Sequence, residues 1–127
     1  MKKSSLCCVK FCRNRRRKNA RICNKHASAR FKELHPIKYR YNIAKQSAKS
    51  RGIEWNLSYE EFEKFCTETG YLRNSGKTRD KLTIDRIDPT QGYHYRNLRA
   101  IPHFMNSKLG AIYGAYLGMI ERRRCKC

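Results

Sequence analysis

Four residues near the N-terminus, Cys7, Cys12, Cys23 and His26, have the types and the spacing of a metal site. They form a C-x4-C pair and a C-x2-H pair that are separated by ten residues. Thiolate and imidazole donors in two local pairs suit a tetrahedral zinc ion. We therefore expect one structural Zn²⁺ that organises this segment. Cys8 is an alternative ligand to Cys7, and the alternative to a metal site is a set of incidental thiols.

The segment between the two pairs is strongly basic. Bound metal would close it into a loop and hold its cations against a phosphate backbone. The alternative is a disordered basic arm. The candidate nucleic-acid-binding residues of this loop are Arg13, Arg15, Arg16, Arg17, Lys18 and Arg21.

A second group of candidate residues lies in the stretch LTIDRIDPTQGYHYRNLRAIPHFMNSKLG, residues 82–110. We expect Asp85 at the end of a strand, Asn97 after a long turn and Asn106 inside a helix. A carboxylate oxygen and an amide oxygen are hard donors that suit Mg²⁺ or Mn²⁺, and a phosphate with water would complete the octahedron. Asp85 and Asn106 are therefore the candidate ligands. The alternative is that these are turn-forming and surface residues.

Periodicity and end signals predict the helices that precede this stretch. Residues 36–51 have the apolar spacing of a basic amphipathic helix with a proline in its first turn. Residues 58–70 are expected to form a second helix that ends at a glycine, because Ser58 and Glu61 have the spacing of a capping box. Residues 71–81 are polar and contain glycine, which predicts a loop.

The remaining elements are predicted in the order β, β, α. Residues 82–88 and 98–101 have the composition of strands, and a closing helix is expected from Pro102 onward. The predicted fold class is α+β, with a small zinc knuckle followed by helices and a ββα finger. The expected regions are a basic zinc-binding finger (1–35), a helical DNA-gripping region (36–70), the ββα finger (71–120) and a basic tail (121–127).

Three glycines, Gly110, Gly114 and Gly118, lie four residues apart on one face of the predicted closing helix. Their spacing permits close approach of another element. We expect that element to come from the same chain, with a dimer contact as the alternative.

Residues 82–110 resemble the HNH endonucleases, especially a phage subgroup with the pattern DRID…GY…N…N..K. The likeness extends upstream through AKSRGIEWNLSYEEF, and residues 7–26 resemble small zinc-binding fingers at the start of phage HNH-type nucleases and related phage DNA-binding proteins. Together these matches cover most of residues 7–110. The resemblance implies metal-dependent hydrolysis of DNA. The chain lacks the two C-x2-C pairs that add zinc to many HNH fingers, so the finger must be held by its own packing.

The resemblance also implies a role for each matching position. Asp85 and Asn106 match the catalytic metal ligands, and Asn97 matches an asparagine that braces the turn by hydrogen bonds. Lys108 matches a lysine that faces the phosphate. Arg86 stands where the family has its general-base histidine.

Arg86 cannot activate water as a base, because arginine keeps its proton at any physiological pH. It can still bind a phosphate oxygen and stabilise charge that develops during attack. The base is then another group, metal-bound hydroxide, or absent. We favour His103 over His94, because His103 lies three residues before Asn106 and so shares its helix face.

The charge of the chain agrees with a nucleic-acid partner. Thirty Lys and Arg against ten Asp and Glu give a net charge of +20, which opposes compaction unless a polyanion neutralises it. The helix over residues 36–51 adds Lys45, Lys49 and Arg51 as candidate contacts to double-stranded DNA. No stretch reaches the roughly 18 apolar residues of a membrane span.

The start of the chain lacks the apolar core of a secretory signal, so we expect an intracellular protein, in the cytoplasm of the host cell if it is phage-encoded. Seven cysteines, an odd number, fit reduced metal-binding thiols better than a disulfide framework. The leading hypothesis is a phage-type HNH endonuclease. The alternative is a non-catalytic nucleic-acid-binding protein on a degenerate HNH fold, such as a packaging, virion or ribonucleoprotein component, and Arg86 is its best argument.

Overall fold

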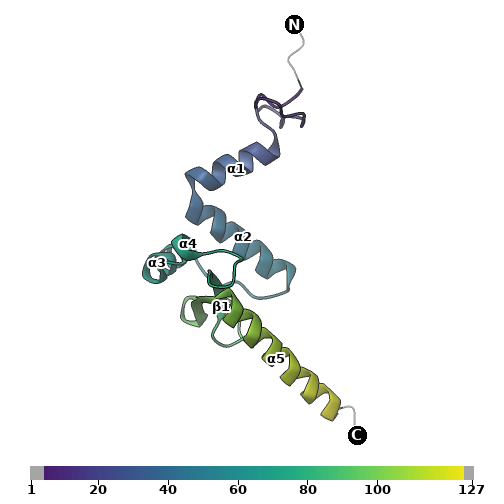
Figure 1. Ribbon diagram of the computed structural model, residues 1–127, viewed down its shortest axis with the longest axis vertical. Coiled ribbons are helices and arrows are strands. Elements are labelled where there is room, and N and C mark those ends of the chain that lie inside the picture. The colour runs from purple at the N-terminus through teal and green to yellow at the C-terminus, as the bar shows by residue number, and fades with distance from the viewer. Residues whose placement is uncertain (1–4, 125–127) are drawn as a thin grey trace. The chain divides into compact units, whose positions relative to one another are not determined.

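The computed structural model describes residues 5–124 and has an α+β fold (Figure 1). The described part forms two compact units, one ending at Ala44 and the other beginning at Lys45. In chain order, the elements are α1 (Asn24–Leu34), α2 (Pro36–Ser50), α3 (Tyr59–Thr69), α4 (Tyr71–Asn74), β1 (Leu82–Arg86), the short 3-10 helix η1 (Tyr95–Asn97), β2 (Leu98–Pro102) and α5 (His103–Arg124).

The first unit has almost no apolar core. Of residues 5–44, only Cys7 and Cys23 are buried, and helix α1 buries none of its residues. A short antiparallel bridge joins Leu6, just before Cys7, to Arg15 in the loop between the two cysteines. Apolar burial this small cannot offset the entropy of ordering the loop. The unit therefore needs another source of stability at its two buried cysteines.

Helix α2 confirms the helix predicted from Pro36 and ends one residue earlier than expected, at Ser50. Gly52 has a left-handed φ of 66°, and the N–H of Ile53 donates a hydrogen bond of 2.9 Å to the carbonyl of Ala48. This closing pattern at a glycine satisfies carbonyl groups at the end of a helix.

The capping box predicted for α3 is present. Glu61 N–H donates to Ser58 Oγ at 3.1 Å, and Ser58 N–H donates to Glu61 Oε2 at 2.9 Å. Leu57 and Phe62, which flank this cap, are 3% and 0% exposed. The helix ends at Gly70, which has a φ of 63°. These residues anchor the apolar core of the second unit.

The prediction of a loop over residues 71–81 was wrong at its start, because Tyr71–Asn74 form helix α4. Tyr71 is buried, and its ring lies 6.0 Å from the ring of Phe65 and 6.5 Å from that of Phe62. Asn74 Nδ2 donates to the Gly70 carbonyl at 3.1 Å. Packing of a tyrosine against α3 thus stabilises a turn that local composition assigned to a loop.

Strands β1 and β2 pair antiparallel, with Asp85 opposite Arg99 and Leu82 opposite Pro102. β1 ends at Arg86, two residues before the predicted end, because the chain turns at Asp88. Asp88 Oδ1 accepts hydrogen bonds from the Thr90 N–H at 2.9 Å and the Thr90 hydroxyl at 2.6 Å. The order β, β, α is confirmed, and Pro102 is the last residue of β2 rather than the first of α5.

The turn between the strands is fixed against the segment after α2. A Cβ on Gly92 would lie 2.6 Å from the Glu54 carbonyl oxygen, so no larger residue fits there. The next residue, Tyr93, donates its N–H to the same carbonyl at 2.8 Å, and its carbonyl accepts the Asn56 N–H at 2.8 Å. These bonds hold the Tyr93 side chain in a defined place, 7% exposed.

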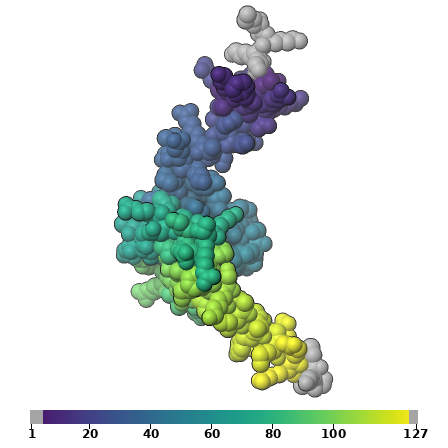
Figure 2. Space-filling model, in the orientation of Figure 1, coloured from purple at the N-terminus to yellow at the C-terminus, as the bar shows by residue number. Residues whose placement is uncertain are grey.

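Helix α5 packs on the sheet near its start, and its later turns extend beyond the other described elements of the second unit (Figures 1 and 2). Apart from the adjoining backbone of α5 itself, no described atom lies within 4 Å of a Cβ built on Gly110, Gly114 or Gly118. The expectation that another described element packs on this glycine face was therefore wrong. The helix continues through Arg124, so the first four residues of the predicted tail are helical.

The last three residues of that tail, 125–127, lie outside the described residues. Of the helices that the structure describes, none combines the length and the apolar character needed to cross a membrane.

Candidate functional site

The four predicted zinc ligands converge at the N-terminal end of α1, where Cys23 is the N-cap residue. Cys7 Sγ and Cys23 Sγ each lie 3.3 Å from His26 Nδ1, and Cys12 Sγ lies 3.9 Å from Cys23 Sγ. The four ligand atoms all lie within 4.8 Å of one another. These residues are close enough to bind one metal ion.

The donor set fits a tetrahedral zinc. Zinc-to-ligand bonds of about 2.0–2.3 Å place neighbouring ligand atoms roughly 3.5–3.8 Å apart in a tetrahedron, close to the observed 3.3–3.9 Å. Cys7 is buried within the cluster, whereas Cys8 is exposed and outside it. The geometry therefore favours Cys7 over Cys8 and is compatible with a structural zinc.

The surroundings of the cluster favour thiolates at two of its cysteines. Hydrogen bonds from the His26 backbone and ring lower the pKa of Cys23 to about 6, despite burial. At Cys7, burial raises the pKa, but hydrogen bonds from backbone N–H groups and the His26 ring outweigh burial and lower the pKa. The pKa of Cys12 is raised: a hydrogen bond from the Asn14 backbone lowers it, but burial and the neighbouring thiols outweigh this. A central cation would favour all three thiolates, the form that binds metal.

The basic loop presents most of its cations to solvent. Arg16 is the exception, since it is half-buried and its Nη1 donates to the Ala20 carbonyl at 3.4 Å. Exposed guanidinium and ammonium groups are available to a phosphate backbone. The exposed cations are Arg13, Arg15, Arg17, Lys18 and Arg21.

We expect replacement of Arg13, Arg15 and Arg17 by glutamine to weaken DNA binding on every sequence. Each lost phosphate contact should flatten the plot of log affinity against log salt concentration by about 0.9, so three contacts reduce the slope by about 2.7. Glutamine at the exposed positions 122–124 removes the same charge outside the loop and is the matched control. Fluorescence anisotropy over a salt series measures the affinity and the salt slope of the two triple variants. Equal slopes for the two triple variants would contradict a dedicated role for the loop.

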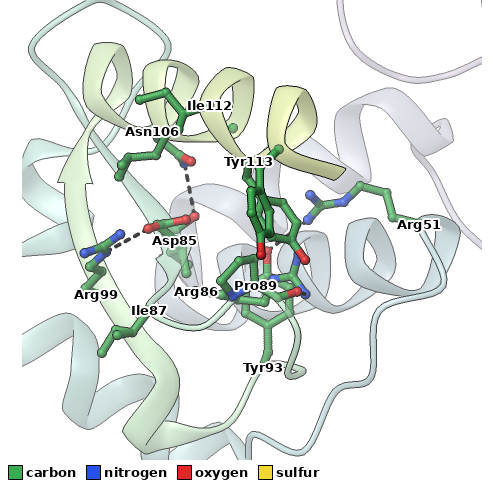
Figure 3. Close-up of a pocket in the computed structure, with 14 residues that line it drawn as sticks. Arg51, Asp85, Arg86, Ile87, Pro89, Tyr93, Arg99, Asn106, Ile112 and Tyr113 are labelled. Carbon is green, nitrogen blue, oxygen red and sulfur yellow. Dashed lines mark hydrogen bonds and ion pairs between the residues drawn. The ribbon is translucent and has the colours of Figure 1, made fainter. Parts of the chain in front are cut away.

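The second unit has a cavity of about 550 Å³ that brings together several of the predicted nuclease residues (Figure 3). Asp85 and Arg86 line it from β1, and Asn106 lines it from α5. Arg51, predicted as a nucleic-acid contact, lines it from the residue after α2. The strand, the helix and the chain after α2 thus place an acid, an amide and two cations around one cavity.

Asp85 is paired with Arg99, which was not among the site residues predicted from the sequence. Arg99 Nε donates to Asp85 Oδ2 at 2.7 Å, and the Arg99 and Asp85 side chains are 39% and 17% exposed. Figure 3 marks this ion pair with a dashed line. Among the described residues, Oδ1 of Asp85 accepts no hydrogen bond, so one carboxylate oxygen remains for a cation. Strand register could have identified Arg99 from the sequence, because residues that lie opposite each other on antiparallel strands point to the same face of the sheet.

Asn106 is held by β1 through its amide nitrogen. Nδ2 donates to Thr83 Oγ1 at 2.9 Å and to the Ile84 carbonyl at 3.4 Å. Nothing in the described chain donates to Oδ1, the atom that would bind a cation. Asp85 and Asn106 therefore offer one hard oxygen each at the same cavity, a partial ligand set that suits a divalent ion completed by phosphate and water.

Arg86 secures the turn that follows β1. Its Nη1 donates to the Pro89 carbonyl at 2.9 Å and the Gln91 carbonyl at 2.8 Å. Its guanidinium lies 5.6 Å from the ring centre of Tyr93. At the position where the resemblance implies a general-base histidine, this chain thus has a cation that holds the turn and still lines the cavity.

Asn97 braces the same turn, as the resemblance implies. Its Oδ1 accepts the Asp88 N–H at 2.8 Å, and its Nδ2 donates to the carbonyls of Asp88 at 3.0 Å and Gly92 at 2.9 Å. The residue is 4% exposed and does not line the cavity. Its place in the structure is therefore that of a positioning residue for the turn.

Replacement of Asn97 by alanine should destabilise the second unit by roughly 1–3 kcal/mol, because the partly buried Asp88 N–H and Gly92 carbonyl lose their partner, whereas the Asp88 carbonyl keeps the hydrogen bond from the Gln91 N–H. Asn56→Ala is the matched control, since its exposed side chain bonds only to Glu54; its expected effect is below about 1 kcal/mol. Urea unfolding measures the free energy of unfolding of the two variants. A loss at Asn97 no larger than that of the control would show that the turn does not depend on this side chain.

Other predicted site residues do not line the cavity. His103, His94 and Lys108 are not among its lining residues. His103 N–H donates to the Lys81 carbonyl at 2.9 Å, and the His94 ring lies 3.0 Å from Gln91 Oε1. Lys45 and Lys49 are exposed on α2, and they do not line it either. The structure thus places no histidine among the residues that line the cavity with Asp85 and Asn106.

Comparison with known proteins identified no family for this chain. No family model, curated protein or solved structure matched the chain.

Proposed function

We propose that the chain is a metal-dependent endonuclease of the HNH kind that hydrolyses phosphodiester bonds of DNA. The observation that carries the proposal is that Asp85 from β1 and Asn106 from α5 line one cavity in a β, β, α arrangement. Three arginines line the same cavity. Arg99 is paired with Asp85, and Arg51 and Arg86 would bind phosphate oxygens. The zinc-binding segment would add sequence-independent contacts through its exposed cations.

Asp85 and Asn106 are the residues that would hold Mg²⁺ or Mn²⁺, each through its Oδ1 atom. When bound, such an ion polarises the scissile phosphate and neutralises its developing charge. The chain's own groups then have two tasks. Thr83 and Ile84 orient the Asn106 amide, as their hydrogen bonds indicate. Arg51 and Arg86 would orient the DNA backbone.

The proposed reaction needs a general base other than Arg86. Arg86 cannot accept a proton, and no histidine lines the cavity. A histidine base would therefore have to reach the attacking water from outside the lining residues. His103→Ala tests this possibility: a rate loss of about 10²–10⁴-fold is expected of a lost base, and an unchanged rate assigns the base elsewhere.

The alternative function is non-catalytic nucleic-acid binding on a degenerate site of the same kind. Two observations favour it: Asp85 is engaged by Arg99, and Arg86 is used to hold the turn. In this account the cations serve binding alone. A packaging, virion or ribonucleoprotein role would follow.

Nicking of supercoiled plasmid separates the two functions. If the chain is a nuclease, wild type nicks in Mg²⁺ or Mn²⁺, and Arg86→Ala nicks about 10²–10³-fold more slowly through lost charge stabilisation. If wild type is inert and Arg86→His gains metal-dependent nicking, the site is degenerate and the binding function is supported.

A further inference from the structure

The cavity beside Asp85 is larger and more apolar than a metal ion and one phosphate require. Its volume of about 550 Å³ falls in the range of about 300–1,000 Å³ typical of sites for small organic ligands. Helix α5 lines it with Ile112, Tyr113 and Tyr116, and the chain after β1 adds Ile87 and Pro89 (Figure 3). The site therefore has a surface for a planar apolar group next to its polar end.

Two guanidinium groups meet a third tyrosine at this cavity. Arg51 Nη2 donates to Tyr93 Oη at 3.0 Å, and the Arg86 guanidinium lies 5.6 Å from the centre of the same ring. Tyr93 is buried, so both cations are anchored at the wall of the cavity. Fixed positive charge beside an aromatic surface suits a ligand with a planar ring and a phosphate.

We propose that this cavity holds an unstacked nucleotide of the DNA strand, with its base against Tyr113 and Tyr116 and its phosphate toward Arg51 and Arg86. The inference rests on the proposed function of the site and names the form of its substrate. Tyr116 is 58% exposed, so an incoming base can cover its ring. Burial of that surface would favour binding.

Regular duplex DNA cannot use this aromatic surface, because each base is covered on both faces by its neighbours. Extrusion of a base from a duplex costs a few kcal/mol, and least where the base is already unpaired. Stacking on an aromatic side chain returns about 1–3 kcal/mol per base. The cavity therefore favours DNA with an unpaired nucleotide, such as a bulge, over a fully paired duplex.

The test is equilibrium binding of the zinc-loaded full chain to fluorescent DNA without Mg²⁺ or Mn²⁺. Three duplexes of equal length are compared: fully paired, with a single-thymidine bulge, and with an abasic nucleotide in place of that thymidine. The abasic form keeps the distorted backbone but removes the base. The bulge with a base should bind about 5- to 140-fold tighter than both others, the equivalent of about 1–3 kcal/mol.

The double variant Tyr113→Leu with Tyr116→Leu should lose this preference and keep the affinity for paired duplex. Phe104→Leu is the matched control, because Phe104 is an exposed aromatic residue of α5 that does not line the cavity. It should keep the preference. Equal affinity for the thymidine and abasic bulges in wild type would overturn the proposal, as would a preference that persists in the double variant.

Binding tests the nucleotide pocket, and cleavage tests the nuclease function. A preference for the unpaired base with no nicking under any metal would support the nucleotide pocket and contradict the nuclease. Nicking without that preference would support the nuclease and contradict the pocket.

Discussion

Removal of zinc will unfold residues 5–34 of the first unit and leave the second unit folded. Only two cysteines are buried among residues 5–44, whereas the second unit has its own apolar core around α3 and α4. Binding of zinc to small metal-dependent folds is worth about 10–16 kcal/mol at neutral pH, far more than this segment gains by apolar burial. Two-dimensional amide NMR should show signals of residues 5–34 collapsing on chelation while those of α3, β1 and β2 persist.

Metal analysis measures the number of zinc ions that each chain binds. We expect about one zinc per chain in wild type and loss of that zinc in Cys12→Ser or Cys23→Ser. Cys8→Ser is the matched control, because Cys8 is exposed and outside the cluster, and it should keep the metal. A folded first unit free of zinc, or full zinc content in Cys23→Ser, would contradict this prediction.

The four residues of the candidate metal site could be found from the sequence because their spacing is local. Cys7 and Cys12 belong to one short loop, and Cys23 and His26 to one helix start, so backbone geometry alone brings each pair together. The cap of α3 was predictable for the same reason, since Ser58 and Glu61 bond within three residues. Short-range rules of this kind do not depend on the rest of the fold.

Features that depend on tertiary contacts were missed. Helix α4 forms because Tyr71 packs on α3, and Arg99 faces Asp85 because of strand register. The prediction that His103 shares the site followed helical spacing from Asn106, but the cavity lies along other residues of α5. A shared helix face does not specify which part of that face meets the cavity.

Asp85→Ala and Asn106→Ala are each expected to abolish cleavage. Each substitution removes one of the two protein oxygens that would hold the cation, while Arg51 and Arg86 remain to bind DNA. Loss of one preorganised charge partner typically costs about 10²–10³-fold in rate, and loss of the cation itself costs more. DNA affinity without Mg²⁺ or Mn²⁺ should stay close to wild type.

Asp85→Ala also leaves Arg99 without its carboxylate, so the comparison needs a fold check and a second variant. Asp85→Asn keeps the size of the side chain and removes its charge, and it should be inactive as well. Asp80→Ala is the matched control, because Asp80 is an exposed acid outside the cavity, and it should cleave like wild type. Cleavage by a folded Asp85→Asn variant at the wild-type rate would contradict the assignment of Asp85.

The most direct measurement is the rate of nicking of supercoiled plasmid by the zinc-loaded full chain, with and without Mg²⁺ or Mn²⁺, in wild type and in Asp85→Ala. We expect nicking only when both the added divalent ion and Asp85 are present. Equal nicking by Asp85→Ala, or no nicking by folded wild type in either ion, would contradict it.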